Sequence, residues 1–190
     1  MTIAALAGPS ALVAAVATVL GAIFLGLFFW KGGLWGLLND LASIVLMLAT
    51  IPVALFLGDA AGTDWPGIGA PVVTGIGIVG MLGASVAQGL LVLRVRTYRQ
   101  LLPWTLGFGA VVGAWYVLVG VLGLQAGFPG ALMALAIASG AGFIAIGYGF
   151  WRGNERHPLS IVGGVVLLFA STAFLVWVGF AAIAVDGLSR

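Results

Sequence analysis

The sequence contains no cysteine and very little charge. The absence of cysteine excludes disulfides, thiolate metal sites and thiol nucleophiles from this 190-residue chain. Only 6% of the residues are charged, whereas a soluble domain carries about 25%. Seven basic and five acidic side chains cannot cover a water-facing surface of this size, so most of the surface must contact lipid. The net charge of +2 is too small and too scattered to indicate binding to nucleic acid.

Long apolar runs take the place of the missing charge. Hydrophobic residues make up 63% of the chain, and the mean hydropathy is +1.26. The runs are continuous rather than alternating, which indicates membrane helices rather than a transmembrane barrel. About 20 apolar residues in a helix span the hydrocarbon core. The sequence therefore predicts an all-α integral membrane protein, a single domain over residues 1–190 with six transmembrane helices at about 11–30, 34–58, 71–93, 101–124, 131–151 and 159–185.

The distribution of charge predicts how the chain is oriented. With six spans, the loops after the first, third and fifth lie on one side of the membrane, and they contain six of the seven basic residues. Basic residues near span ends stay in the cytoplasm. We therefore expect loops 31–33, 94–100 and 152–158 to be cytoplasmic and both termini to lie outside, in a bacterial plasma membrane. Four tryptophans then fall at the cytoplasmic interface, the depth that this residue prefers: Trp30, Trp35, Trp104 and Trp151.

One ionisable residue falls inside a predicted span. Asp40 lies roughly two turns into the second run, and a charged residue at such a depth indicates a proton or cation site. Neighbouring polar residues on the second and third runs extend this hypothesis to a cluster, namely Asn39, Ser43, Ser85 and Gln88. The alternative, which we favour from sequence alone, is that the helix starts near Asp40 and that its carboxylate caps the helix N-terminus.

Glycine is abundant, with 31 residues, many inside the apolar runs. Membrane helices associate through close packing at small residues, because lipid supplies no hydrophobic force between them. We expect the third, fourth and fifth helices to pack tightly at Gly80, Gly83, Gly109, Gly113 and Gly140. The alternative use of Gly109 and Gly113 is a contact between two copies of the chain.

Basic side chains at the cytoplasmic loops predict contact with anionic lipid headgroups. The residues concerned are Arg94, Arg96, Arg99, Arg152 and Arg156. The single histidine, His157, lies in the last of these loops with Glu155 as its one nearby carboxylate, so we predict no metal site, no cofactor and an ordinary solvated turn. No catalytic motif or acid–base pair is present, and we expect no enzymatic activity.

A weak internal similarity relates the first and fifth runs. Residues 26–58 align without gaps onto residues 147–179, and the best match pairs Phe29-Trp30-Lys31-Gly32 with Phe150-Trp151-Arg152-Gly153. An aromatic residue followed by a basic one is also what any helix shows on reaching the cytoplasm. The interpretation that we favour is therefore coincidence, with a parallel duplication as the alternative.

Two functional hypotheses follow. The first is a non-catalytic membrane subunit, scaffold or lipid-interacting protein, with lipids, other membrane subunits or further copies of the chain as partners. The second is a small transporter or channel for a neutral or apolar solute, with Asp40 as a proton or cation site. Polar lining for such a path is sparse in the outer half of the bundle, where the candidates are Thr50, Thr74, Tyr116, Ser139, Ser171 and Thr172.

Overall fold

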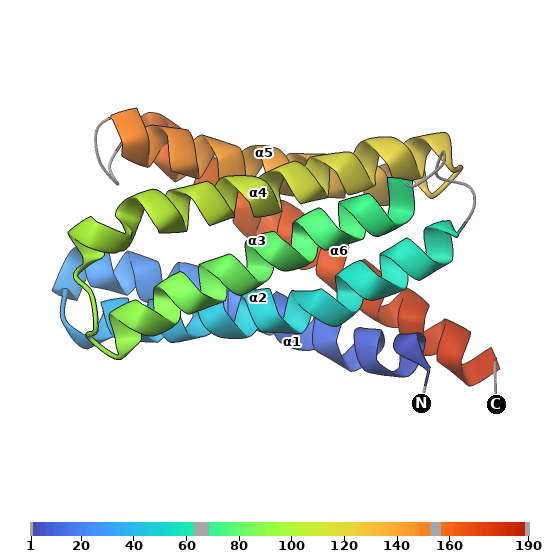
Figure 1. Cartoon of the computed structure of the whole chain (residues 1–190), viewed down its shortest axis with the longest axis horizontal. Helices are drawn as coiled ribbons and strands as arrows, with labels where there is room; N and C mark the ends of the chain where they lie inside the picture. The colour runs from blue at the N-terminus through green and yellow to red at the C-terminus, as the bar shows by residue number, and fades with distance from the viewer. Residues whose placement is uncertain (1, 63–68, 153–156, 189–190) are drawn as a thin grey trace.

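The computed structural model describes residues 2–62, 69–152 and 157–188, and these form six long helices (Figure 1). The helices are α1 (Ile3–Lys31), α2 (Leu34–Ala61), α3 (Gly69–Val92), α4 (Tyr98–Gln125), α5 (Gly130–Arg152) and α6 (Pro158–Leu188). All six are long and apolar enough to cross a membrane. The predicted fold class, an all-α bundle of six membrane helices, is confirmed.

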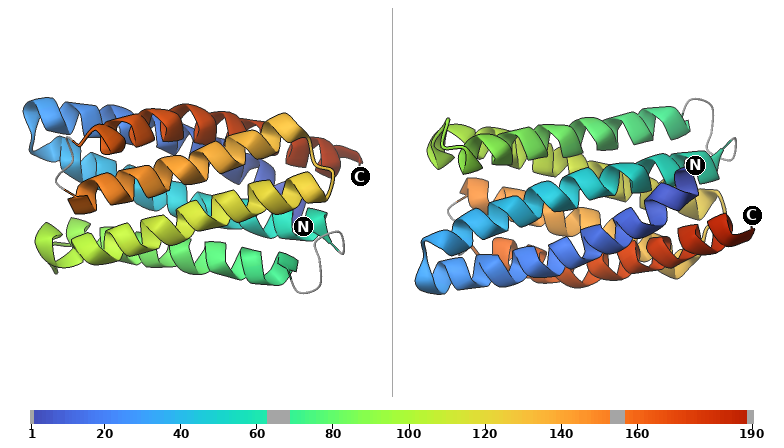
Figure 2. Two further views of the ribbon diagram at one scale, coloured as in Figure 1. Left: turned by 90° about the horizontal axis from the view of Figure 1, so that it is seen from above. Right: turned by 90° about the horizontal axis from the view of Figure 1, so that it is seen from below.

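The helices form a closed ring in which each packs chiefly against two others. Consecutive helices are neighbours in this ring. The ring closes where α1 packs against α6, and the two lie side by side in Figure 2. Because the chain runs up and down, every neighbouring pair is antiparallel. Both chain ends lie at one end of the bundle, here called the terminal end. The opposite end, called the basic end, holds the last residues of α1, α3 and α5 and the first residues of α2, α4 and α6.

The helix boundaries extend beyond most of the predicted spans. The largest difference is at α1, which begins at Ile3 rather than at residue 11. The Thr2 hydroxyl accepts a hydrogen bond from the Ala5 N–H, so the helix is capped at its first turn. Pro9 lies inside this helix and does not end it, as is common in membrane helices. Pro52 is likewise inside α2.

Large side chains fill the interior from the middle of the bundle to the terminal end. The largest fully buried ones are Trp115, Tyr116, Phe174, Met81 and Met133. None of the largest fully buried side chains in the described chain lies within ten residues of the basic end of its helix. The residues buried in that stretch are mostly small: Ala42, Ala84, Ser85, Ala87, Leu101, Gly149, Ser160 and Gly163.

The seams between helices are closed by glycine at several depths. A Cβ at Gly113 would lie 2.9 Å from the carbonyl oxygen of Gly140, so α4 and α5 approach backbone to backbone. Gly142 and Gly163 bring α5 and α6 together in the same way, with a Cβ at Gly142 placed 2.9 Å from the Gly163 oxygen. At the α1–α2 seam the glycine contacts are with side chains: a Cβ at Gly21 would lie 3.7 Å from Ala42, and one at Gly36 would lie 3.0 Å from the Phe28 ring.

Candidate functional site

Asp40 lies within α2, not at its start. The helix begins at Leu34 with Gly33 in the N-cap position, so the favoured interpretation of Asp40 as a helix cap is wrong. The reason is that apolar residues 34–38 extend the helix toward the basic end, where the Gly32–Gly33 pair precedes its first residue. Asp40 and its neighbour Asn39 are both half-buried. The Asn39 Oδ1 atom faces α1, 3.8 Å from where a Cβ of Gly21 would be.

The other polar candidates satisfy their hydroxyl groups within their own helices. Ser43 donates a hydrogen bond to the Asn39 carbonyl at 2.9 Å, and Ser85 donates to the Met81 carbonyl at 2.8 Å. Gln88 is half-buried, and its Oε1 atom is buried without a hydrogen-bond partner. Within the described residues, no hydrogen bond joins the polar side chains of α2 to those of α3. The five candidates therefore share the basic half of two adjacent helices without forming one connected network.

An aromatic cluster occupies the centre of the bundle, and sequence reasoning did not identify it. The Tyr116 ring lies between Phe143, at 6.0 Å and 20°, and Phe174, at 5.5 Å and 74°. Trp115 packs edge-on against Tyr116 at 4.6 Å. The Tyr116 hydroxyl and the Ser171 hydroxyl are 3.4 Å apart. The sequence alone indicates Tyr116 and Ser171 only as candidate polar lining for a solute path. Together with the aromatic rings around them, they fill the interior of the bundle.

The glycine candidates divide into two groups. Gly80 lies against Val111 and Val112 of α4, and Gly83 lies against the ring of Phe108. Gly113 and Gly140 meet each other across α4 and α5, as described above. Gly109 differs, because no atom of another helix lies within 4 Å of where its Cβ would be. Gly109 and Gly113 lie on the same face of α4, as their spacing predicts. This face contacts α5 at Gly113 but not at Gly109.

The four arginine candidates that the structure describes lie at the basic end, and one of these four lines a groove. Arg94, Arg96 and Arg99 are exposed around the α3–α4 connection, and Arg152 is exposed at the end of α5. Arg156 lies outside the described residues. Arg96 faces the groove between α3 and α4, together with Gln100 and Trp104. This groove has a volume of about 590 Å³, and its remaining wall is apolar, including Leu82, Val86, Ala87, Leu90, Leu101 and Phe108.

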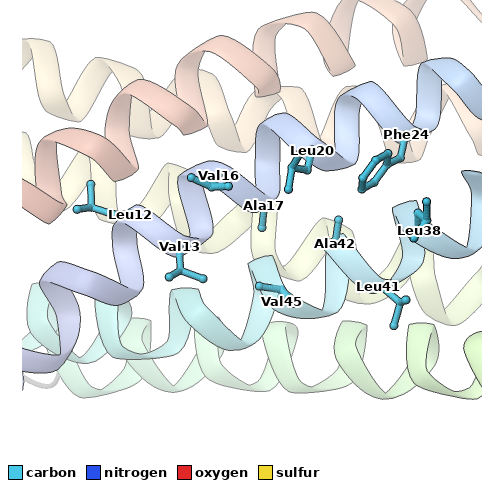
Figure 3. A pocket seen from close by; sticks show the side chains of 10 residues that line it. All are labelled: Leu12, Val13, Val16, Ala17, Leu20, Phe24, Leu38, Leu41, Ala42 and Val45. Carbon is cyan, nitrogen blue, oxygen red and sulfur yellow. The ribbon is translucent and has the colours of Figure 1, made fainter.

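A second groove lies between α1 and α2 and is lined by apolar residues alone (Figure 3). Its volume is about 450 Å³. Val16, Leu20 and Val45 in its wall are each more than 40% exposed, so the groove opens on the outer surface of the bundle. The α3–α4 groove opens outward too, since Val86 and Trp104 are 62% and 63% exposed. Both grooves therefore open on the outer surface of the bundle rather than into its interior.

The single histidine acts locally at the start of α6. The His157 Nδ1 atom accepts a hydrogen bond from the Leu159 N–H at 3.2 Å, and the His157 carbonyl accepts from Ser160 N–H at 2.8 Å. These are the contacts of a helix cap. Among the described residues, no three acidic or histidine side chains come together as a metal site would require.

Comparison of the chain with models of protein families, with curated proteins and with solved structures found no match.

Proposed function

We propose that this chain is a non-catalytic, multi-pass membrane protein that acts through contacts with lipid on its outer surface. The observation that carries the proposal is the position of the two grooves. Both open on the outer surface between neighbouring helices, and one of them combines an apolar wall with a basic mouth. The interior between them is filled by Trp115, Tyr116 and Phe174, each at most 1% exposed. This packing argues against a through path for solutes.

The proposal includes an orientation, with the basic end in the cytoplasm. The exposed Trp30, Trp104 and Trp151 are all near this end, as expected at a headgroup region. Because the chain has no cysteine, single cysteines can report the orientation directly. A membrane-impermeant maleimide should label Asp59→Cys in intact cells and label Val95→Cys only after permeabilisation. Both positions are exposed and lie at opposite ends of the bundle. Labelling in the reverse order would overturn the orientation.

Native mass spectrometry of the protein extracted in mild detergent tests the function itself. We expect the full chain to retain phospholipid through extraction, at a stoichiometry that survives gentle activation. A stoichiometric partner protein bound in addition would assign the chain to a membrane complex as a subunit or scaffold. A chain that releases all lipid as readily as an unrelated six-helix protein of equal size would contradict the proposal.

The second candidate function is transport of a small neutral or apolar solute. It is favoured by one observation, that Asp40 lies six residues inside α2 and is half-buried, rather than capping the helix. If Asp40 carries a proton or cation during transport, Asp40→Asn should abolish flux while expression and thermal stability remain unchanged. The matched control is Asp59→Asn, at an exposed position near the terminal end of the same helix. Equal flux in both variants would remove Asp40 from consideration.

A further inference from the structure

The groove between α3 and α4 differs from the α1–α2 groove in having two chemically distinct parts. At the basic end its wall is polar, with Arg96 and Gln100, and Trp104 stands beside them. Toward the middle of the bundle its wall is apolar, with Val86, Leu82 and Phe108 among its members. The α1–α2 groove has the apolar part only.

The polar mouth is held in place by backbone hydrogen bonds. After α3, the Arg94 N–H donates to the Leu91 carbonyl and the Val95 N–H donates to the Leu90 carbonyl, both at 3.0 Å. This pattern is a Schellman turn, with Arg94 in the left-handed conformation at φ 56°. The turn leads directly into α4, so Arg96 is fixed between two helix ends rather than carried on a long loop.

The mouth suits a phosphate group. Within the described residues, no carboxylate lies within ion-pair distance of Arg96, so its charge is free to meet an anion. The Gln100 Oε1 atom accepts a hydrogen bond from the Thr97 N–H at 3.1 Å, which leaves the amide NH₂ group for another acceptor. The mouth also lies at the N-terminus of the 28-residue α4, the end of a helix that favours negative charge.

The apolar part suits an acyl chain that continues from such a headgroup. Gln100 and Phe108 are eight residues apart on α4, which is about 12 Å along the helix axis, and Leu90 and Leu82 are equally far apart on α3. The Trp104 and Phe108 rings stack at 6.1 Å and 27° to form one wall. Gly83 allows the Phe108 ring to lie directly against α3, which ends the groove at that depth.

We infer that this groove binds one anionic phospholipid, with the phosphate at Arg96 and Gln100 and an acyl chain along Val86 and Trp104. The inference rests on the proposed function, and it assigns that function to one site and one class of lipid. It also separates Arg96 from the neighbouring arginines. Arg94 on the same connection and Arg99 in the first turn of α4 are exposed but line no described groove, so they attract headgroups only through their charge.

The test adds phosphatidylglycerol or phosphatidylcholine, each separately, to the delipidated protein. Native mass spectrometry measures how much of each lipid is bound. We expect Arg96→Gln to weaken phosphatidylglycerol binding about fivefold to tenfold, since a charge-assisted contact is lost. Arg99→Gln is the matched control and should reduce binding less than twofold. Phosphatidylcholine binding should be similar in the two variants. Inorganic phosphate at the same concentration should not displace the lipid.

A second pair of variants tests the acyl part of the groove. Val86 and Val79 lie seven residues apart on α3, and each is 62% exposed, but only Val86 lines the groove. Val86→Trp should fill the groove and weaken phosphatidylglycerol binding about as much as Arg96→Gln. Val79→Trp should leave it unchanged. The melting temperatures of all four variants should agree with that of the wild-type protein, because every substituted side chain is exposed.

The outcomes separate this inference from the function beneath it. Phospholipid that binds the wild-type protein but is indifferent to Arg96→Gln and Val86→Trp would overturn the site and leave lipid binding intact. Displacement by inorganic phosphate would show a simple anion site and would overturn the lipid assignment. Failure of the wild-type protein to retain either lipid would overturn both the inference and the proposed function.

Discussion

The two ends of the bundle differ in the size of the side chains that they bury. From the middle to the terminal end, large side chains such as Phe174 and Met133 fill the interior completely. Near the basic end the buried residues are mostly small, and the polar Asn39, Asp40 and Gln88 lie half-buried beside them. Apolar composition alone therefore does not fill the interior of a membrane bundle with large side chains. Close contact between backbones occurs in both halves, since a Cβ at Gly120 in the terminal half would lie 2.8 Å from the Met133 carbonyl oxygen. The terminal half adds large buried side chains to these contacts, whereas the basic half has few.

The largest expected effect comes from removing a core ring of the terminal half. Phe174→Ala should lower the free energy of unfolding by about 3–5 kcal/mol, because it deletes a fully buried ring and leaves a cavity. Phe150→Ala in the basic half should cost less than half of that, since Phe150 is only half-buried. Unfolding of the purified protein in detergent by a denaturing surfactant measures both. Equal losses would contradict the difference between the halves.

A smaller effect should come from separating two backbones in the basic half. A Cβ at Gly149 would lie 2.7 Å from the Ser160 nitrogen and would also strike the Ser160 hydroxyl. Gly149→Ala should therefore destabilise the protein by about 1–3 kcal/mol, the usual cost of overpacking. Gly164→Ala is the control on the partner helix α6, because no atom of another helix lies within 4 Å of its Cβ position. The same unfolding assay should show a change below about 0.5 kcal/mol for the control.

The smallest effect concerns single hydroxyl groups. The Thr105 Oγ1 atom in the basic half is buried without a hydrogen-bond partner, whereas Thr50 donates to the Leu46 carbonyl at 2.7 Å. Thr105→Val should stabilise the protein by up to about 1 kcal/mol, because a buried group without a partner is removed. Thr50→Val should destabilise it by about 0.5–1 kcal/mol. A loss of stability in Thr105→Val would show that its hydroxyl has a partner in the membrane.

The sequence was sufficient to predict the fold class, because span length and charge are properties of the chain itself. Helix ends at Gly32 and around Arg94 were predicted to within a few residues for the same reason. Asp40 was harder, since an aspartate seven residues after the Gly32–Gly33 pair fits either a cap or a helix interior. The choice depends on whether apolar residues 34–38 join the helix, which no local pattern decides.

The sites that depend on which helices face each other were not predictable. The Tyr116 ring stacks on Phe143 and meets Phe174 edge-on, so the cluster joins three helices, and each residue is separately unremarkable in the sequence. The same applies to Arg96, which has the same residue type and exposure as Arg94 and Arg99. Only the three-dimensional path of α3 and α4 places Arg96 in a groove. Spacing between small residues also did not reveal that Gly109 lacks a neighbour.

The closure of the ring between α1 and α6 has a consequence for biogenesis. This seam is made by Gly8 and Ile183, by Leu12 and Gly179, and by the Thr2 hydroxyl, which donates to the Asp186 carboxylate at 2.7 Å. Four helices separate its two sides in the sequence, so α1 leaves the ribosome before α6, since chains are synthesised from the N-terminus. The alanine-rich face of α1 must therefore remain against lipid until α6 has been inserted. The ring then closes only when α6 displaces that lipid and packs against α1.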